Sequence, residues 1–266
     1  MKIGIVGMGY VGSAVYTSYQ GLADVKFHDP AKSDSVSLQD LVEWNPDAIF
    51  VCVPTPQNAD GSCDIGIVDS TLTQINNLGY LQLVVCKSTA PAEQYGIWWC
   101  DMRYKLVHAP EFLKATNSIE DYISPHLVVL GGKPGECAEA FGIIARSHVK
   151  LSNTRVQVTD IKTAALFKYA ANTFLAMKVV FANQLNQYCR ANAGNWNQLA
   201  EMLAGDHRLG DTHWQVPGPD GSFGYGGSCF PKDISAIIHD AKRFNADFTL
   251  LEQVQNINQQ LRTETL

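Results

Sequence analysis

The sequence predicts an α/β protein in which a doubly wound, mostly parallel sheet precedes an all-helical domain with one long helix. Short β-branched runs alternate with helical stretches in the first part of the chain, as in sheets covered by helices on both faces. A glycine-rich turn follows the first of these runs. From about residue 159 to residue 193 the chain contains neither Gly nor Pro. We therefore expect one domain over residues 1–158 and a second over residues 159–266.

The elements expected in the first domain follow from local apolar patterns and turn residues. Strands are short apolar runs that end at Gly, Pro or Asp, and helices fill the longer stretches between them. The expected strands are residues 2–6, 25–28, 47–53, 82–86, 106–107 and 127–130, and the expected helices are residues 13–21, 38–44 and 67–77.

A glycine motif, Gly7-Met8-Gly9-Tyr10-Val11-Gly12, joins the first expected strand to the first helix. Its glycines permit a tight turn and close approach of a pyrophosphate, which would rest on the helix N-terminus. The second strand ends at Asp29, where a carboxylate would bind the ribose hydroxyls and repel a 2′-phosphate. This order of elements predicts a Rossmann-type domain that binds NAD rather than NADP.

The long helix expected after residue 159 is apolar around most of its circumference. A helix of that kind is buried, and we expect a partner subunit as well as its own domain to cover it. Lys168 and Asn172 interrupt the apolar surface four residues apart, on one face. A lysine whose stem is buried while its ammonium reaches solvent would also explain Lys168. Two polar residues on an otherwise apolar surface nevertheless favour a functional role.

A second glycine-rich segment delivers Cys229 to the start of another helix. The segment reads Gly224-Tyr225-Gly226-Gly227-Ser228-Cys229-Phe230-Pro231-Lys232-Asp233, and Pro231 suits the first helical position. The helix N-terminus and the nearby Lys232 would favour a thiolate. A small buried hydrophobic cysteine beside an ordinary turn is the alternative. The long loop before it, residues 206–228, is of the kind that usually carries function.

Composition excludes several classes of protein. The chain has 266 residues, a net charge of −6 and no basic run, which argues against a nucleic-acid partner. No uninterrupted apolar run approaches the roughly 20 residues of a membrane span, and no signal peptide precedes Gly7. The seven cysteines form no C-x-x-C pair, which predicts a reducing cytoplasm and no metal site. The isolated His108 is expected to have a structural hydrogen-bonding role.

Taken together, the motifs resemble those of the UDP-glucose/GDP-mannose dehydrogenase family over essentially the whole chain. They occur in the family's order, and an ordered set is far more specific than a glycine motif alone. Besides the two glycine-rich segments they are Val53-Pro54-Thr55-Pro56, Lys87-Ser88-Thr89-Ala90-Pro91, Pro110-Glu111-Phe112-Leu113, Lys168-Tyr169-Ala170-Ala171-Asn172-Thr173-Phe174-Leu175-Ala176 and Asp206-His207-Arg208-Leu209-Gly210.

The resemblance implies a four-electron oxidation of a nucleotide sugar's C6 alcohol to a carboxylate, of the UDP-glucose to UDP-glucuronate type used in polysaccharide biosynthesis. Cys229 would be the nucleophile, forming first a thiohemiacetal and then a thioester. Lys168 would stabilise the oxyanion, and Asn172 with Asp233 would hold water or a sugar hydroxyl. Glu111 would act in acid–base steps. Thr89 would position water or the nicotinamide end.

The resemblance also implies contacts with cofactor, substrate and partner. A homodimer would form through the long helix, with Arg208 reaching toward the partner subunit. The residues expected to contact NAD are Gly7, Gly9, Tyr10, Val11, Gly12, Asp29, Lys32, Thr55, Thr89 and Lys232. Those expected to contact the nucleotide sugar are Glu111, Phe112, Leu113, Lys168, Asn172, Arg208, Ser222 and Gly226.

Three features depart from the family's pattern. Ala115 stands where a second glutamate is usual, which puts thioester hydrolysis in question. Ala164-Ala165-Leu166 replaces the usual A-E-L before the lysine. The sequence ends at Leu266, which predicts a short form that lacks the family's C-terminal nucleotide-sugar-binding domain.

Two other interpretations stay open. A two-electron 3-hydroxy-acid dehydrogenase has a similar outline and a similar length, with a Lys and an Asn four residues apart, but it does not need Cys229. A catalytically impaired NAD-binding partner protein would explain Ala115, although the retention of Cys229, Lys168, Asn172 and Asp233 opposes it.

Overall fold

The computed structural model describes residues 1–263, apart from the side chain of Ala115. The chain forms two compact units. The first consists of Met1–Pro56 and Asp64–Lys168, and the second joins Gln57–Cys63 to the chain from Tyr169 onward. The units divide after Lys168, whereas the sequence predicted a boundary after residue 158. The division lies within a helix because Ile161 and Ala165, on its first turns, belong to the core of the first unit.

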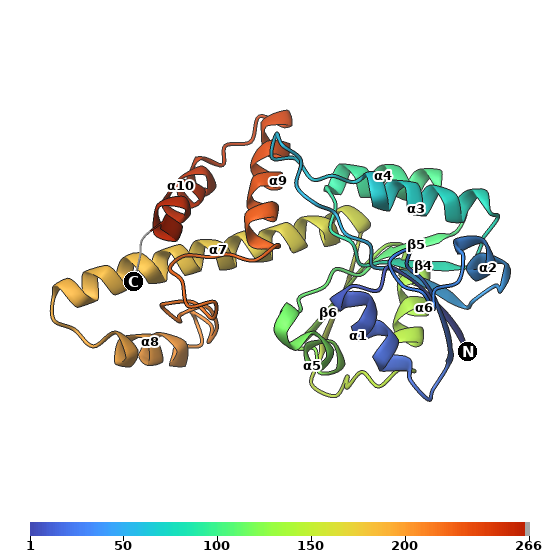
Figure 1. The fold of residues 1–266 in the computed structure, drawn as a ribbon, viewed down its shortest axis with the longest axis horizontal. Coiled ribbons are helices and arrows are strands. Elements are labelled where there is room, and N and C mark those ends of the chain that lie inside the picture. The colour runs from blue at the N-terminus through green and yellow to red at the C-terminus, as the bar shows by residue number, and fades with distance from the viewer. Residues whose placement is uncertain (264–266) are drawn as a thin grey trace. The chain divides into compact units, whose positions relative to one another are not determined.

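The first unit is built on a seven-stranded sheet with the order β2-β1-β3-β4-β5-β6-β7 (Figure 1). Every neighbouring pair is parallel except β5 and β6, which are antiparallel. The doubly wound, mostly parallel sheet is therefore confirmed. The strands are β1 (Lys2–Val6), β2 (Asp24–His28), β3 (Ala48–Val51), β4 (Leu83–Cys86), β5 (Lys105–His108), β6 (Leu127–Gly131) and β7 (Arg155–Thr159).

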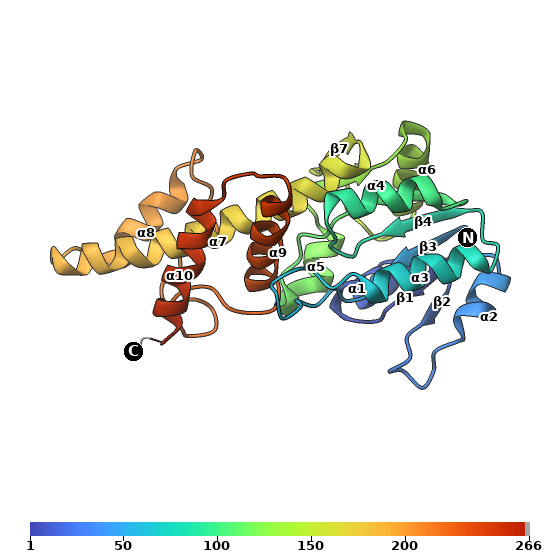
Figure 2. The ribbon, with the colours of Figure 1, turned by 90° about the horizontal axis from the view of Figure 1, so that it is seen from above.

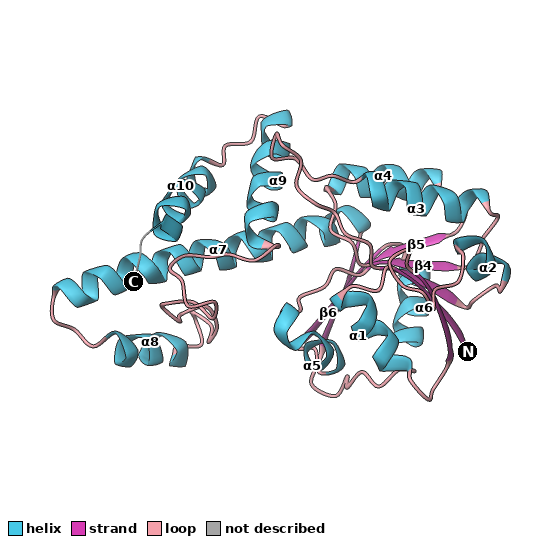
Figure 3. Ribbon diagram, in the orientation of Figure 1, coloured by secondary structure: helices cyan, strands magenta, loops and turns pink. Residues whose placement is uncertain are grey.

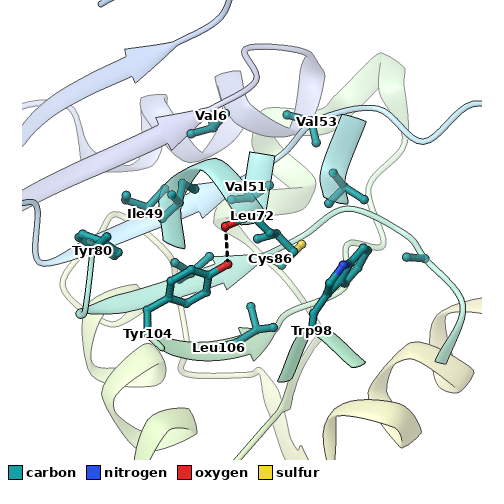
Figure 4. Packing of buried hydrophobic residues seen from close by; sticks show 14 of the residues in the cluster. Val6, Ile49, Val51, Val53, Leu72, Tyr80, Cys86, Trp98, Tyr104 and Leu106 are labelled. Atoms are coloured by element: carbon teal, nitrogen blue, oxygen red, sulfur yellow. Dashed lines mark hydrogen bonds between the residues drawn. The ribbon is translucent and has the colours of Figure 1, made fainter. Parts of the chain in front are cut away.

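Both faces of this sheet are buried, because alternate residues of each central strand point to opposite sides. On β3, Ala48 and Phe50 pack on one side, while Ile49 and Val51 pack on the other. Figure 4 shows part of the core on the side of Ile49 and Val51. There the Tyr104 hydroxyl donates a hydrogen bond of 3.2 Å to the Leu72 carbonyl. The continuous apolar runs of the strands follow from burial on both faces.

Helices cover the two faces of the sheet (Figures 1 and 2). The cores assign α2, α3 and α4 to one face and α1, α5 and α6 to the other. The sequence prediction missed α4, α5, α6 and β7. The bounds are α1 (Tyr10–Tyr19), α2 (Leu38–Glu43), α3 (Gly66–Asn77), α4 (Ala92–Asp101), the 3-10 turn η1 (Ala115–Asn117), α5 (Ser118–Ile123) and α6 (Pro134–Ile144).

Helices and loops make up the second unit from Tyr169 to Thr263 (Figure 3). Its elements are the remainder of α7 (Ile161–Ala191), then α8 (Trp196–Gly205), α9 (Phe230–Arg243) and α10 (Thr249–Thr263). One core joins α7, α9 and α10, and another joins α7, α8 and Trp214. The expected all-helical domain with one long helix is thus confirmed.

Helix α7 is, among the described residues, the one helix long and apolar enough to cross a membrane by length and composition. Half of its qualifying 18-residue stretch is buried within the protein. A core helix of a folded domain has the same properties, so this feature by itself indicates little.

Candidate functional site

The glycine turn after β1 forms a cradle that larger residues would fill. Gly7 has φ of +90°, and a Cβ there would lie 2.8 Å from the Cys52 carbonyl oxygen. A Cβ on Gly12 would lie 1.9 Å from the Gly7 oxygen, whereas one on Gly9 would meet open space. Gly9 is the N-cap of α1, and no side chain caps this helix end. The turn and the helix N-terminus therefore fit the pyrophosphate of a dinucleotide.

Asp29 lies at the carboxyl end of β2 and is tied to the glycine turn. Its Oδ2 accepts a 2.6 Å hydrogen bond from the Met8 N–H, and Oδ1 accepts one of 2.9 Å from the Ala31 N–H. The bond from Met8 is the main reason that the pKa of Asp29 lies below its usual value. The carboxylate keeps lone pairs for a diol, so this side of the cradle fits an adenosine ribose.

The other residues predicted to contact the cofactor lie at several places in the two units. Tyr10 begins α1 and is 40% exposed, and Val11 follows it, half-buried. Lys32 is exposed, and its N–H donates to the Asp29 carbonyl at 3.0 Å. Thr55, which is buried, and Thr89, which is half-buried, follow strands β3 and β4. Lys232 belongs to the second unit and is described with it below.

An ion pair is buried beside strands β4 and β5. Lys87 Nζ lies 3.4 Å from Glu111 Oε2, and the two side chains are only 7% and 9% exposed. Lys87 Nζ also donates to the Ala109 carbonyl at 3.2 Å and lies 5.1 Å from the centre of the Tyr122 ring. Among the described residues, Glu111 Oε1 is buried and has no hydrogen-bond partner. Such an oxygen can accept a proton or a hydrogen bond from a ligand.

Lys168 also contacts Glu111, but through the backbone. Its Nζ donates to the Glu111 carbonyl oxygen and lies 5.2 Å from the centre of the Phe112 ring. Phe112 packs edge-on against Phe167 at 5.6 Å, and Leu113 packs on the core shared with α1. The predicted residues Glu111, Phe112 and Lys168 therefore form one cluster within the first unit.

His108 has the structural hydrogen bond that the sequence predicted. Its Nδ1 lies 2.9 Å from the Cys86 carbonyl, which requires a proton on Nδ1. The ring is fully buried and lies 4.0 Å from the Tyr95 ring. Burial lowers the pKa of His108 to about 3, so the imidazole is neutral at physiological pH.

The second unit contains the cysteine and three of its predicted partners. Cys229 is the N-cap of α9, and its carbonyl accepts a 2.9 Å hydrogen bond from the Asp233 N–H. Asp233 is 1% exposed. Asn172 Nδ2 donates to Asp233 Oδ2 at 2.5 Å, and Lys232 Nζ donates to Oδ1 at 2.5 Å. Helix α9 begins at Phe230, so Pro231 occupies the second helical position rather than the first.

The glycine-rich segment before Cys229 is fixed by side chains of α7 and α10. Asn258 accepts from the Tyr225 N–H at 2.7 Å and donates to the Tyr225 carbonyl at 3.0 Å, as a neighbouring strand would. Asn183 accepts from the Gly224 N–H at 3.1 Å. Arg262 pairs with Asp220 at 2.7 Å. The backbone that leads to the thiol is therefore held by specific bonds rather than left free.

The remaining predicted substrate residues lie in or beside the loop 206–228. Arg208 is exposed, and its guanidinium forms an ion pair of 2.5 Å with Asp206. The Ser222 N–H donates to Asp220 at 3.1 Å. A Cβ on Gly226 would lie 2.8 Å from the Arg262 guanidinium, so the absence of a side chain at Gly226 leaves room for Arg262.

Several residues that shape these clusters were missed by the sequence analysis. Lys178 donates to the carbonyls of Leu209 and Gly210 at 3.0 Å each, and burial lowers its pKa. A lysine within an apolar helical run is the signal that identified Lys168, and it applied equally to Lys178. Lys87 directly follows a buried strand, which was a usable signal. Asn183, Asn258 and Arg262 have no motif that marks them.

The arrangement can support dehydrogenase chemistry in two parts. The first unit offers a dinucleotide cradle and a buried carboxylate with a free oxygen. The second offers a thiol at a helix N-terminus. In the described part of the chain, no group of three or more His, Cys, Asp or Glu could hold a metal ion.

Two family descriptions match the chain. Residues 42–147 match the NAD binding domain of the UDP-glucose/GDP-mannose dehydrogenase family, and residues 162–260 match the central domain of the same family. The first match agrees with the glycine cradle and Asp29, and NAD is therefore the cofactor.

Relatives with known names extend over most of the chain. A putative UDP-glucose 6-dehydrogenase, YtcA of Bacillus subtilis, is 30% identical over 296 residues, covering 97% of this chain and 67% of the relative. UDP-glucose 6-dehydrogenase of Rickettsia conorii is 31% identical over 251 residues, covering 91% of this chain and 56% of the relative. The chain thus spans between about half and two thirds of the length of these relatives.

Solved structures share the fold. A UDP-glucose dehydrogenase of Pyrobaculum islandicum superimposes with a TM-score of 0.85 at 24% identity, over 97% of this chain and 68% of that one. A 3-hydroxyisobutyrate dehydrogenase of Mycobacterium tuberculosis superimposes with a TM-score of 0.77 at 15% identity, over 97% and 92%. The fold therefore does not distinguish the families of these two proteins, but the family descriptions that match the sequence do. The chain belongs to the UDP-glucose/GDP-mannose dehydrogenase family.

Proposed function

We propose that the protein is an NAD-dependent nucleotide-sugar 6-dehydrogenase that oxidises a C6 alcohol to a carboxylate in two steps. The observation that carries the proposal is the junction of α7 and α9 within the second unit. There Cys229 caps α9, and Asp233, one turn later, is hydrogen-bonded to Asn172 and Lys232. An ordinary alcohol oxidation to a ketone gives a thiol no part, whereas an oxidation to an acid can proceed through a thioester on a thiol.

Each residue has a distinct part in the proposed mechanism. Two molecules of NAD, bound one after the other, would each supply the hydride acceptor for one of the two oxidations. Glu111 receives the proton of the C6 hydroxyl at its free oxygen, and Thr89 positions the reacting end of the substrate or a water. Cys229 Sγ adds to the aldehyde carbon while the carbonyl oxygen becomes an oxyanion, which the Lys168 ammonium stabilises. The thiohemiacetal that results is the substrate of the second oxidation.

The second oxidation converts the thiohemiacetal to a thioester on Cys229. Water then attacks the thioester carbon, the carbon–sulfur bond breaks, and the thiol and the acid are released. Asn172 and Asp233 hold this water or a sugar hydroxyl. Ala115 stands where relatives of the proposed class carry a second glutamate, so Glu111 is the carboxylate that we assign to the hydrolysis.

The binding roles follow from the same proposal. The adenosine ribose lies on Asp29 and the pyrophosphate on the glycine cradle, with Tyr10, Val11, Lys32, Thr55, Thr89 and Lys232 as further NAD contacts. The sugar nucleotide contacts Phe112, Leu113, Ser222, Gly226 and Arg208. The exposed guanidinium of Arg208 suits a phosphate of this ligand or of a ligand bound to a partner subunit.

Product stoichiometry tests the proposal. The purified protein is incubated with NAD and a panel of UDP- and GDP-sugars, and NADH is followed by absorbance while the product is identified by mass. Two NADH per acid, with a protein thioester trapped in a slow variant, supports the nucleotide-sugar dehydrogenase. One NADH per product, formed from a 3-hydroxy acid, supports the two-electron alternative. NAD binding without turnover of any of these substrates supports an impaired partner protein.

A homodimer is part of the same proposal. Phe174, Phe181 and Tyr188 recur every seven residues on α7 and are 58%, 53% and 68% exposed. Seven residues is nearly two turns, so these rings lie along one face of the helix, and exposed aromatic stripes mark interaction surfaces. Phe174→Glu with Tyr188→Glu should shift the sedimentation coefficient from dimer to monomer. Leu81→Glu, at an exposed site of the first unit, is the control; an unchanged coefficient in the double variant contradicts the interface.

The cellular setting follows from the same assignment. None of the seven cysteines, all of which lie in the described residues, forms a disulfide, and this pattern is typical of a reducing compartment. We place the protein in the cytoplasm, where a nucleotide-sugar acid would feed polysaccharide biosynthesis.

A further inference from the structure

The buried ion pair between Lys87 and Glu111 holds one oxygen of the carboxylate and leaves the other available. Lys87 Nζ lies 3.4 Å from Oε2 and 3.2 Å from the Ala109 carbonyl, two residues before the glutamate. The Tyr122 ring, 5.1 Å from Nζ, covers the ammonium. These contacts fix the lysine on three sides. Within the described residues, Oε1 of Glu111 is buried and receives no hydrogen bond.

Stability alone gives a poor account of this pair. Removing two charges from water is costly, and apolar residues of similar size often serve a core at least as well. The pair nevertheless lies at the carboxyl ends of β4 and β5, where ligands bind in open α/β sheets. A buried charge at that edge with an unused acceptor is typical of a site built for chemistry rather than for packing.

The two lysines near Glu111 have separate tasks. Lys168 donates to the backbone carbonyl of Glu111, whereas Lys87 contacts the carboxylate itself. Other titratable groups that face the pair are Cys52, Cys86, Tyr122 and His108. Burial raises the pKa of Cys52, Cys86 and Tyr122, and it lowers that of His108, so all four are neutral at physiological pH. Lys87 is thus the cation that compensates the Glu111 carboxylate.

We propose that Lys87 is a positioning residue: it holds the Glu111 carboxylate by Oε2 and presents Oε1 as the base that accepts the proton of the nucleotide sugar's C6 hydroxyl. This inference rests on the proposed function. The proton moves from the hydroxyl oxygen to Oε1 while the hydride leaves the same carbon, so Lys87 itself neither gains nor loses a proton. Lys87 touches no substrate and acts only through Glu111.

A double-mutant cycle on kcat tests this inference. Glu111→Gln removes the base, and kcat should fall roughly 10²- to 10³-fold. Lys87→Met keeps the length of the side chain without its charge, and kcat should fall roughly 10- to 100-fold with KM values unchanged. In the Glu111→Gln background, Lys87→Met should lower kcat less than about twofold further, because a positioning residue has no effect once its target is absent.

The exposed ion pair on β5 provides a matched control. Lys105 Nζ lies 2.7 Å from Glu139 Oε2, with the two side chains 42% and 36% exposed, and Lys105→Met should leave kcat unchanged. Each variant is checked for its thermal unfolding midpoint and for NAD binding by fluorescence. If Lys87→Met does not fold, Lys87→Gln replaces it, because its amide still donates to the Ala109 carbonyl without carrying a charge.

The outcomes separate this inference from the proposed function. Effects of Lys87→Met and Glu111→Gln that multiply in the double variant would overturn the inference alone, as would a change confined to KM. A native protein that oxidises no nucleotide sugar would overturn the proposed function and this inference with it. A non-additive cycle in an active enzyme supports both.

Discussion

Each of the two units buries one of the carboxylates that the proposed function uses, but the two carboxylates are held differently. Asp233, in the second unit, has both oxygens occupied, by Asn172 on one side and Lys232 on the other. Glu111, in the first unit, has one oxygen paired with Lys87 and the other without a partner among the described residues. A carboxylate with a donor on each oxygen is held firmly and keeps only its remaining lone pairs for a water or hydroxyl, whereas an oxygen without a donor is available to accept a proton.

Burial alone does not identify a reactive group. Asp233 is the more deeply buried of the two, at 1% against 8% exposed. Its hydrogen bonds fix the first turn of α9 and so fix the position of Cys229. Under the proposed function we assign reactivity in the second unit to the thiol, and in the first unit to Oε1 of Glu111. Variants at and around these groups test this division.

Removal of the thiol should have the largest effect. Cys229→Ala should lower the rate of acid formation on the order of 10⁴-fold or more, because no other group forms the covalent intermediate. Product analysis by mass measures the acid, and NAD titration followed by fluorescence should give an unchanged dissociation constant. Acid formation from UDP-glucose at the native rate would show that the thiol is not the nucleophile.

Loosening the backbone before Cys229 should have the next largest effect. Asn258→Ala removes two hydrogen bonds to Tyr225 and leaves a buried N–H and a buried carbonyl unpaired. Unsatisfied buried groups of this kind should lower the free energy of unfolding by about 2–3 kcal/mol, measured by urea denaturation. Asn192→Ala, at an exposed asparagine that only bonds within its helix end, is the control. A loss below about 0.5 kcal/mol would mean that the segment is held by other contacts.

The cofactor cradle should show a smaller and more selective effect. Asp29→Asn keeps the shape of the side chain but removes the charge that accepts bonds from Met8 and Ala31. The dissociation constant for NAD should rise about tenfold, which is about 1.4 kcal/mol, while that for NADP should rise less or fall. Isothermal titration with both cofactors measures the ratio. An equal rise for the two would refute a role in ribose recognition.

At neutral pH, His108 should contribute the smallest effect, because its protonation lowers stability only as the pH falls. Its folded-state pKa, about 3, lies below the usual value near 6.5, so the unfolded chain binds a proton more readily. Stability should therefore fall as pH drops from about 6.5 toward 3, by at most about 1.4 kcal/mol per pH unit. His108→Gln, which can still donate to the Cys86 carbonyl, should have a shallower slope in urea unfolding between pH 7 and pH 4. Identical slopes would exclude this residue as a source.

Local patterns determined much of the first unit and the place of the cysteine. The glycine cradle, Asp29, the central strands and the long helix α7 are readable because each depends on neighbouring residues: turn chemistry, apolar periodicity and helix caps. The N-cap position of Cys229 is of the same kind. Helices α4 and α6 were missed because their apolar residues do not form a clear stripe among small and aromatic neighbours. Strand β7 was missed because it is a short polar run at the sheet edge.

Tertiary structure alone decided which distant residues meet. Lys87 and Glu111 are 24 positions apart and become partners because β4 and β5 are adjacent in the sheet. Asn258 and Tyr225 are 33 positions apart and meet because α10 packs beside the glycine-rich segment. No periodicity or turn signal encodes such pairs, since they depend on strand order and helix packing. The sequence by itself determined the chemical groups of this protein, and the fold decided which of them are held and which are left free to react.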